Sequence, residues 1–542
     1  MAETRAKEVD AAKKKKTRQK KLKDLEISDV PFIALGREGD CFVYFVKKTK
    51  RIERITIGNH KARNLLLLAD SSFWYKVDNG AGATSLRSYE YCVGLHGGAT
   101  FNVERVRNVG MWNEDGRVLY NAGNACYAVE NGEIVPVDNT RPNGRIYTAG
   151  DALPEPGLEM MTDEQGKAFA DFLNAYPWRE ERGGDLFAGL VVQALLSGFV
   201  PLRVHGWITA PSGSGKSMLF NRLNQLTGGL ICNMEGGTEA GVRQRINGIA
   251  LPVGYDEAET DPDEKSGSCM KQLLAIGRAA TDTGKLWQGG QNGKPMLYLV
   301  NSAFLLFSIN SALNKAANES RFMHLHLLPS SDKEPMDKAF KAAVDAVNIG
   351  AFIARMMHIA PVLLKNIASL QAILKHGRRE KLFSVVLACR HALTSRELMT
   401  PDQLTEAATL VEASTVAKVE TDDAARCIET IMQYRPQGLG RDTDLQGLLY
   451  AERTRQTGVE TATGEYGVKM VTSNGNEGIF VQHTHTIITK ALFGSEWQAG
   501  CRDALLNLQG AKACKQKIRM GHNSVNGIWI PAHHVFDIGQ SE

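Results

Sequence analysis

The spacing of hydrophobic and polar positions changes several times along the chain, and each change predicts a different architecture. Residues 31 to about 150 hold short apolar runs of alternating pattern, such as Cys41 to Lys47, separated by turns such as Glu38-Gly39-Asp40. Alternation with a period of two is typical of half-buried strands. We therefore predict a β-rich N-terminal domain over residues 31–155.

Helical periodicity replaces this alternation from residue 156. Thr162 and Gln165 have the spacing of a capping box, in which each side chain bonds the backbone N–H of the other residue, so a helix is predicted to begin there. A more apolar helix is predicted around Leu186 to Leu196. We expect residues 156–202 to form a helical linker or collar.

Residues 203–332 alternate apolar strand-like runs with helical segments, which is the order that a parallel sheet requires. Nearly continuous helix follows over residues 333–435, broken at His376-Gly377 and restarted at Thr400-Pro401, where Gln403 completes a second capping box. The first of these segments predicts an α/β core and the second a helical domain.

Residues 436–542 hold a short strand, Gly478 to Gln482, two helical segments and a hairpin-like ending at Ile518 to Pro531. A winged-helix module fits that order, and a generic small α+β appendage fits it equally well. The fold class predicted for the whole chain is multidomain α/β.

Composition agrees with several globular domains. The chain has 542 residues, more than one hydrophobic core usually supports, and 43% of them are apolar. The longest apolar run, Phe187 to Leu202, contains Gln193 and Ser197 and is short for a bilayer, so no membrane segment is predicted. Nine cysteines are scattered singly, without metal-binding spacing, which favours reduced thiols in the cytoplasm.

Charge is concentrated at the amino terminus. The formal net charge of +4 is small for this length, but eight basic residues crowd between Lys13 and Lys23. No periodic apolar face accompanies them, so residues 1–30 are predicted to be a solvated, disordered tail. Contact with a phosphate backbone and simple solubility both explain such a tail.

The segment after His205 to Thr209 has the spacing of a phosphate-binding loop. A predicted buried strand is followed by a glycine-containing loop and then by a helix through Leu219 and Leu223, as the Walker A motif needs. Its glycines let backbone N–H groups surround a phosphate, its lysine reaches the β and γ phosphates, and its serine ligates Mg²⁺. The residues are Ala210, Pro211, Ser212, Gly213, Ser214, Gly215, Lys216 and Ser217. ATP and Mg²⁺ are therefore the expected cofactors.

A pair of carboxylates follows the next apolar stretch. Ala250 to Tyr255 leads into Asp256 and Glu257, as expected of a strand that delivers Asp256 to the metal and Glu257 to the attacking water. Pro252 and Gly254 make this an imperfect Walker B strand. A solvated strand end is the alternative interpretation.

Two further polar residues follow a third predicted strand, Ala303 to Ile309. Asn310 is placed to orient the water or to sense the γ-phosphate, and Arg321 lies immediately before the apolar Phe322 to Leu328. An arginine at this point neutralises charge on the γ-phosphate, and ring motors supply it from the neighbouring subunit. A surface arginine ahead of a strand is the plainer alternative.

A hairpin is predicted between the carboxylates and Asn310, over Leu286 to Leu297. Its glycines mark a tip, with Trp287 before it and Lys294 beyond it. Such a hairpin can carry Lys294 to a phosphate backbone. A plain connecting turn explains the same glycines equally well.

The order of these motifs resembles the superfamily 3 helicases and related phage primase-helicases. The Walker A loop is followed by Asp256-Glu257, the hairpin, Ser308-Ile309-Asn310 and Arg321, and Val109 to Asn124 also resembles prophage replication proteins of this type. The resemblance implies an AAA+ P-loop core, a homo-oligomeric, hexameric ring and movement along single-stranded DNA. No primase activity is assigned, because Glu38 and Asp40 flank Gly39 as in a turn and supply no paired-metal site.

The leading hypothesis is a cytoplasmic, ATP-driven DNA helicase that replicates a phage or other mobile element in a bacterial host. A nucleotide-switched assembly scaffold is the alternative from another class. A double-stranded DNA translocase or loader shares every motif with the helicase.

Overall fold

The computed structural model divides the chain into two compact units, Met1–Ala312 with Ser320–Met399, and Leu313–Glu319 with Thr400–Glu542. The longer segment of the second unit thus begins at Thr400, whereas the sequence pattern places the last domain boundary at residue 436. The structure describes residues 30–77, 86–210, 214–234, 239–256, 266–289, 295–308, 318, 320–330, 332–374, 377–419, 423–436, 444–454, 463–473, 475–493, 495, 497, 500–514, 517–520 and 523–536. The basic tail lies outside them, apart from Val30.

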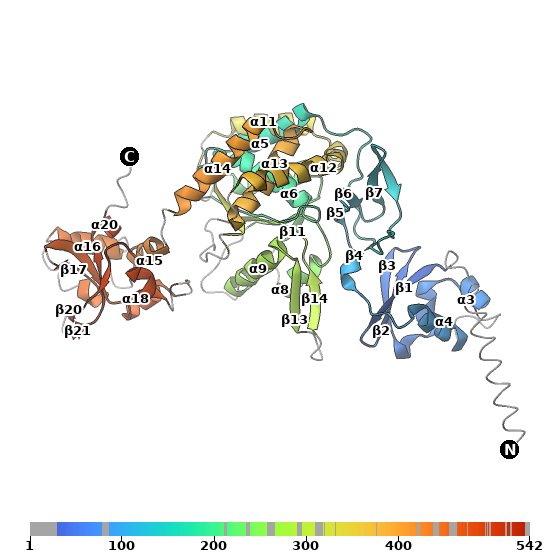
Figure 1. Cartoon of the computed structure of the whole chain (residues 1–542), viewed down its shortest axis with the longest axis horizontal. Helices are drawn as coiled ribbons and strands as arrows, with labels where there is room; N and C mark the ends of the chain where they lie inside the picture. The colour runs from blue at the N-terminus through green and yellow to red at the C-terminus, as the bar shows by residue number, and fades with distance from the viewer. Residues whose placement is uncertain are drawn as a thin grey trace, which may run out of the picture. The chain divides into compact units, whose positions relative to one another are not determined.

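The first unit begins with an antiparallel meander in the order β1-β2-β3, packed against three helices (Figure 1). The indole Nε1 of Trp74 donates to the carbonyl oxygens of Leu65 and Ala69, both at 3.0 Å, which ties two of these helices together. Three helices thus lie between residues 62 and 96, where the sequence pattern predicted mainly strands. The elements are β1 (Phe32–Glu38), β2 (Cys41–Val46), β3 (Arg51–Thr56), α2 (Ala62–Leu68), α3 (Ser71–Val77) and α4 (Leu86–His96), with a 3-10 turn at Ile57–Asn59.

A second antiparallel meander, in the order β5-β6-β7-β8, joins the following core through its first strand. The backbone N–H of Ala250 donates to the Val109 carbonyl at 2.9 Å, and that of Asn113 donates to the Gly198 carbonyl at 3.3 Å. A Cβ on Gly110 would lie 2.2 Å from the Ala250 oxygen, so only glycine fits. The elements are a 3-10 turn at Val103–Arg105, β4 (Val106–Arg107), β5 (Gly110–Glu114), β6 (Arg117–Asn121), β7 (Cys126–Glu130), β8 (Glu133–Val137) and β9 (Ile146–Tyr147), with β4 and β9 paired in parallel.

A five-stranded, wholly parallel sheet forms the core, in the order β11-β12-β15-β10-β16. The predicted parallel α/β sheet is thereby confirmed. Its strands are β10 (His205–Thr209), β11 (Cys232–Met234), β12 (Val253–Tyr255), β15 (Phe304–Ser308) and β16 (Phe322–His326), and the helices between them are α7 (Lys216–Leu226), α8 (Glu239–Arg245) and α9 (Ser266–Thr281). The predicted hairpin is also present, as β13 (Lys285–Gly289) and β14 (Pro295–Leu299), beside α9 (Figure 1).

Helices cover both faces of this sheet. A Cβ on Gly206 would meet Leu190 of α6 (Gly183–Leu195) at 3.3 Å, and the ring of Phe220 in α7 lies 5.1 Å from that of Phe307 on the same face. On the opposite face, Gly277 of α9 contacts Phe322. The sheet is therefore buried on both sides, which explains why its strands are continuously apolar.

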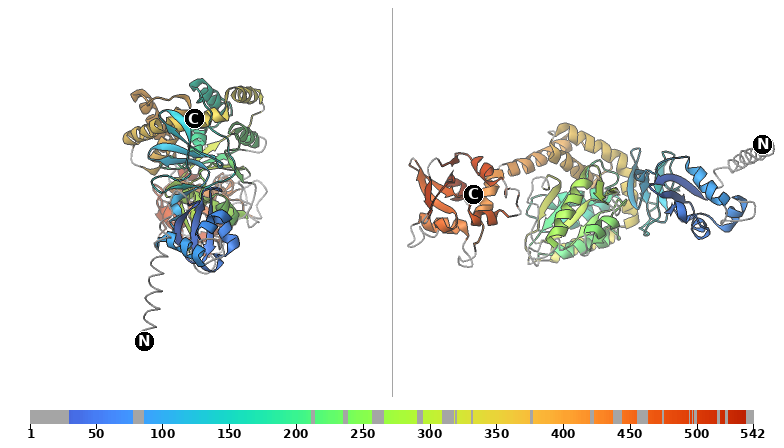
Figure 2. Two further views of the ribbon diagram at one scale, coloured as in Figure 1. Left: turned by 90° about the vertical axis from the view of Figure 1, so that its right-hand side faces the viewer. Right: turned by 90° about the horizontal axis from the view of Figure 1, so that it is seen from below.

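The collar helices and the following segment form one helical bundle, seen as a single group in Figures 1 and 2. The predicted capping box is confirmed, since Thr162 and Gln165 exchange side-chain bonds at the start of α5. The helices are α5 (Asp163–Asn174), α6, α11 (Glu334–Ala346), α12 (Ile349–Ile373) and α13 (Arg378–Thr394). Of the helices described, only α12 is long and apolar enough for a membrane span, but 61% of the qualifying window is buried, so this is weak evidence for one.

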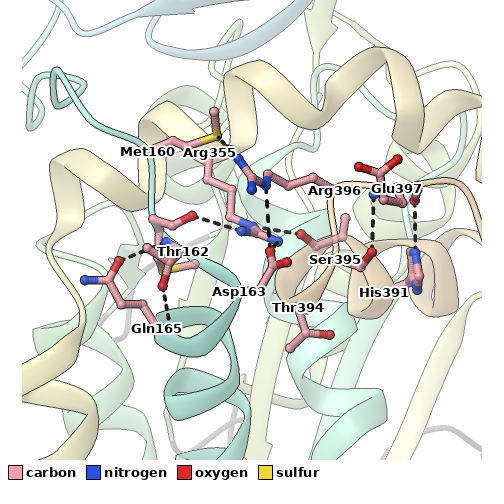
Figure 3. A network of polar contacts seen from close by, with 12 residues as sticks. Met160, Thr162, Asp163, Gln165, Arg355, His391, Thr394, Ser395, Arg396 and Glu397 are labelled. Atoms are coloured by element: carbon pink, nitrogen blue, oxygen red, sulfur yellow. Dashed lines mark hydrogen bonds and ion pairs between the residues drawn. The ribbon is translucent and has the colours of Figure 1, made fainter.

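Arg355 of α12 connects this helix to α5 and α13 (Figure 3). Its side chain is 0% exposed and pairs with Asp163 of α5 at 2.8 Å. Its Nη1 donates to the Met161 carbonyl at 2.9 Å and its Nε to the Ala392 carbonyl at 3.0 Å. A buried cation is tolerated here because each of these contacts supplies an oxygen acceptor.

The second unit contains α14 (Pro401–Val419), which begins with the predicted second capping box between Thr400 and Gln403. A four-stranded antiparallel sheet follows in the order β17-β18-β22-β19, with helices packed on one side. The elements are α15 (Asp423–Met432), α16 (Leu445–Arg453), β17 (Val468–Ser473), β18 (Asn476–Val481), α18 (Thr486–Ala491), α19 (Cys501–Leu506), β19 (Lys512–Ala513), β20 (Ile518–Met520), β21 (Asn523–Val525), β22 (Ile528–Pro531) and α20 (His533–Phe536). The winged-helix assignment stays a prediction.

The Arg355 contacts predict a large effect of one substitution. Arg355→Met should lower the free energy of unfolding of the first unit by about 2–4 kcal/mol, because it leaves two buried carbonyls without donors. Thermal unfolding measures the change. Arg396→Met is the matched control, because Arg396 reaches the same carboxylate only at 4.0 Å and is 55% exposed. Equal effects of the two substitutions would contradict this assignment.

Candidate functional site

The predicted phosphate-binding loop follows the strand at the centre of the core sheet. β10 is buried along its length and lies between β15 and β16. Its pairing extends through Ala210, whose N–H donates to the Ser308 carbonyl at 3.1 Å. Pro211, Ser212 and Gly213 lie outside the described residues.

The loop ends in a glycine that starts helix α7. Gly215 is the N-cap residue and has a φ of +86°, a left-handed conformation that favours glycine. Lys216 and Ser217 are therefore the first two residues of an 11-residue helix, half-buried and exposed respectively. Backbone N–H groups without intrahelical partners gather at such a terminus and attract anions.

Helix α7 is anchored at several points, which fixes the position of this terminus. Leu219, Phe220, Leu223 and Leu226 are buried against the core. Arg222 pairs with Asp337 of α11, and its guanidinium lies 4.7 Å from the centre of the Phe340 ring.

Asp256 lies at the same edge of the sheet as the loop. Tyr255, the last residue of β12, is paired with Leu306, which is paired in turn with Trp207 of β10. Because these strands are parallel, their carboxyl ends meet at one edge, and this is where ligands bind in open α/β sheets. Asp256 is half-buried there. Glu257 and Asn310, which follow β12 and β15, lie outside the described residues.

The irregular composition of the β12 segment has a packing explanation. A Cβ on Gly254 would lie 2.6 Å from Cε2 of Phe220 and 2.8 Å from Cγ2 of Ile231. Glycine is therefore what allows α7 to lie directly on the strand that leads to Asp256. Pro252 precedes the strand, where its missing N–H costs no ladder bond, and its carbonyl accepts from Cys232 at 2.8 Å.

Arg321 lies at the opposite edge of the sheet. Its carbonyl accepts from the N–H of His205, the first residue of β10, at 3.2 Å. The five residues of β10 span roughly 16 Å, so this strand length separates Arg321 from the loop of its own chain. The Arg321 side chain is 17% exposed and shares the Asp282 carboxylate with Arg378, at 3.9 and 3.5 Å. Burial and the nearby Arg378 charge lower the pKa of Arg321.

The hairpin places an aromatic side chain in solvent. Trp287 of β13 is 62% exposed, and Met296 of β14 is 51% exposed. Lys285 at the hairpin base pairs with Glu104 at 2.6 Å. Lys294 belongs to the tip, which lies outside the described residues.

Two histidines that sequence reasoning passed over lie at the same edge as the loop. His324 Nε2 is 2.9 Å from the hydroxyl of Thr209, and His326 Nδ1 is 2.7 Å from a carboxylate oxygen of Glu180. Burial alone would raise the pKa of Glu180, but the hydrogen bonds from His326 lower it below its usual value. The His-x-His spacing at the end of an apolar run was the available signal, since residues two apart share one face of a strand.

Comparison with solved structures shows a shared fold. The helicase Cch of SCCmec type IV, described as active, is 13% identical, with 93% of this chain and 94% of that one covered and a TM-score of 0.51. The apo C-terminal region of NrS-1 is 12% identical, with 92% and 96% covered and a TM-score of 0.34, and JCV helicase is 14% identical, with 38% and 56% covered and a TM-score of 0.24. The chain therefore shares a helicase-like, mixed α/β fold with Cch across nearly its whole length. No family model and no curated protein matches the sequence.

The contact at Gly254 predicts a compensating pair of substitutions. Gly254→Ala should lower the free energy of unfolding by about 1–3 kcal/mol, because the added methyl group overlaps Phe220. The melting temperature should fall accordingly. Gly254→Ala combined with Phe220→Leu should recover part of the loss. Gly289→Ala is the control, since a Cβ there meets nothing within 4 Å. A double variant no more stable than Gly254→Ala alone would contradict this packing.

Proposed function

We propose that the chain is an ATP-hydrolysing motor that acts on nucleic acid, as a DNA helicase for replication of a phage or other mobile element. The observation that carries this proposal is that the glycine-capped start of α7 and Asp256 lie at the same edge of the sheet, the carboxyl ends of β10 and β12. The fold shared with Cch supports it.

The residues at this edge suit Mg-ATP in their chemistry. The N–H groups of the loop Ala210 to Ser217 and the Lys216 ammonium complement phosphate charge. Ser217 and Asp256 offer hydroxyl and carboxylate oxygens, the donors that Mg²⁺ prefers. Bound Mg²⁺ would neutralise charge on the phosphates.

The remaining catalytic assignments extend this site. Glu257 accepts a proton from the attacking water, because it directly follows Asp256 at the strand end. Asn310 orients that water from the end of β15. These two roles rest on sequence position, since both residues lie outside the described part of the chain.

Arg321 completes the site of a second copy of the chain. The core sheet separates it from the loop of its own subunit. Arg321 and Arg378 lie beside the same Asp282 carboxylate, and an arginine guanidinium suits phosphate recognition. We therefore infer a homo-oligomer. The resemblance to superfamily 3 helicases supports a closed ring of six copies, and the resemblance to prophage replication proteins supports the cytoplasm of a bacterial host.

The hairpin supplies the contact with single-stranded DNA. Lys294 belongs to its tip and Trp287 is exposed on its stem, and single-strand binding commonly combines a cation with an aromatic surface.

Steady-state ATPase measurements with and without single-stranded DNA test the function. We expect DNA to accelerate the wild-type protein, Glu257→Gln to lose on the order of 100-fold or more in turnover, and Lys294→Ala to keep basal turnover while losing the acceleration. Lys285→Ala is the control, because it removes a cation from the hairpin base. Turnover indifferent to DNA would instead favour a nucleotide-switched scaffold.

A further inference from the structure

The carboxyl-terminal part of the chain carries a concentration of positive charge. Residues 504–536 contain Lys512, Lys515, Lys517 and Arg519 and no aspartate or glutamate. The formal charge of this stretch, +4, is therefore the same as that of the whole chain. Lys515 lies outside the described residues, whereas the other three side chains are described and exposed.

The register of the four-stranded sheet brings positive charge to one of its faces. Lys469 of β17 pairs with Phe480 of β18, which pairs with Trp529 of β22, which pairs with Lys512 of β19. Directly opposed residues point to the same side of a sheet. The Lys512 ammonium lies 4.5 Å from the centre of the Trp529 ring, as that arrangement requires.

The opposite face of the sheet is the hydrophobic core of the second unit. Val468, Val481 and Ile528 occupy the next row and are buried beneath the helices. Glu477 alternates toward this core side and pairs with Arg453 at 2.9 Å. No acidic side chain therefore belongs to the first face among the strand residues that the structure describes.

The hairpin of β20 and β21 extends this basic row. Lys469 Nζ donates to the Arg519 carbonyl at 3.5 Å, which brings β20 beside β17. We use the term basic face for Lys469, Lys512, Lys517 and Arg519. Lys469 and Lys512 are three strand spacings apart, or roughly 14 Å.

We propose that the basic face binds the phosphate backbone of double-stranded DNA. Lysine and arginine clusters recognise phosphate, and the strand residues described on this face include no carboxylate. Single-strand binding also needs exposed aromatic rings, but Phe480 and Trp529 are 0% and 5% exposed, each packed against a glycine. The spacing of roughly 14 Å is instead similar to the major-groove width of about 12 Å, across which two backbones are presented. This contact needs no nucleotide, so it goes beyond the proposed motor function.

The salt dependence of DNA binding tests this surface in the full-length, nucleotide-free protein. A blunt-ended duplex of arbitrary sequence and a single strand of equal length serve as probes. In Lys512→Gln/Lys517→Gln, the slope of log affinity against log salt on the duplex should become shallower by roughly 1.8, because two phosphate contacts are lost. The matched control Lys490→Gln/Arg502→Gln removes two exposed cations from α18 and α19 and should leave the slope unchanged.

A charge-conserving variant separates the role of charge from damage to the fold. Lys512→Arg/Lys517→Arg should keep the wild-type slope. Equal slopes for the glutamine and control variants on the duplex would overturn the proposal. So would an arginine variant whose slope is as shallow as that of the glutamine variant, or a change of slope on the single strand alone. Since ATP is absent throughout, a failed motor function would leave the result intact.

Discussion

The parallel pairing of β10 between β15 and β16 is the constraint on which the site depends. Because these strands run in one direction, their carboxyl ends share an edge and their amino ends share the other. The loop and Asp256 follow carboxyl ends, whereas Arg321 precedes an amino end. The same pairing thus brings the loop and Asp256 to one edge of the sheet and places Arg321 at the other, so the proposed phosphoryl-transfer site is divided between the two edges. A second copy of the chain is the simplest way to reunite them.

Close backbone contacts join the core sheet to neighbouring elements of the first unit. Gly254 lets α7 lie on β12, and Gly110 lets β5 run against Ala250, just before that strand. The meander that contains β5 also bonds Gly198, shortly before β10. The segments that precede β10 and β12 are therefore both hydrogen-bonded to the same small sheet, which contains β5. The stretch Val109 to Asn124, which resembles prophage replication proteins, contains this strand, so its glycine has a structural reason.

Local sequence signals predicted the elements that surround the site. The strands at β10, β15 and β16, the two capping boxes and the hairpin are all confirmed, because each depends on residues close together in the chain. The helices within residues 62–96 were missed, since short helices of this kind are stabilised by packing such as that of Trp74 rather than by periodicity.

Long-range contacts explain the other differences between prediction and structure. Gly254 weakened the Walker B pattern, and only the proximity of Phe220 shows why glycine is needed there. The bonds of Arg355 to segments 37 and 194 residues away had no sequence signal. The roles of Glu257, Asn310 and Lys294 stay predictions.

Mixing two inactive variants tests the central claim most directly. Lys216→Ala removes the cation of the loop and Arg321→Ala the arginine at the far edge, so each variant alone should lose nearly all ATPase activity. In oligomers co-assembled from equal amounts, about a quarter of the sites would pair an intact loop with an intact arginine from the neighbour, and activity should return in that proportion. Mixed oligomers as inactive as their parents, or an Arg321→Ala protein that is fully active alone, would contradict an active site shared between two copies.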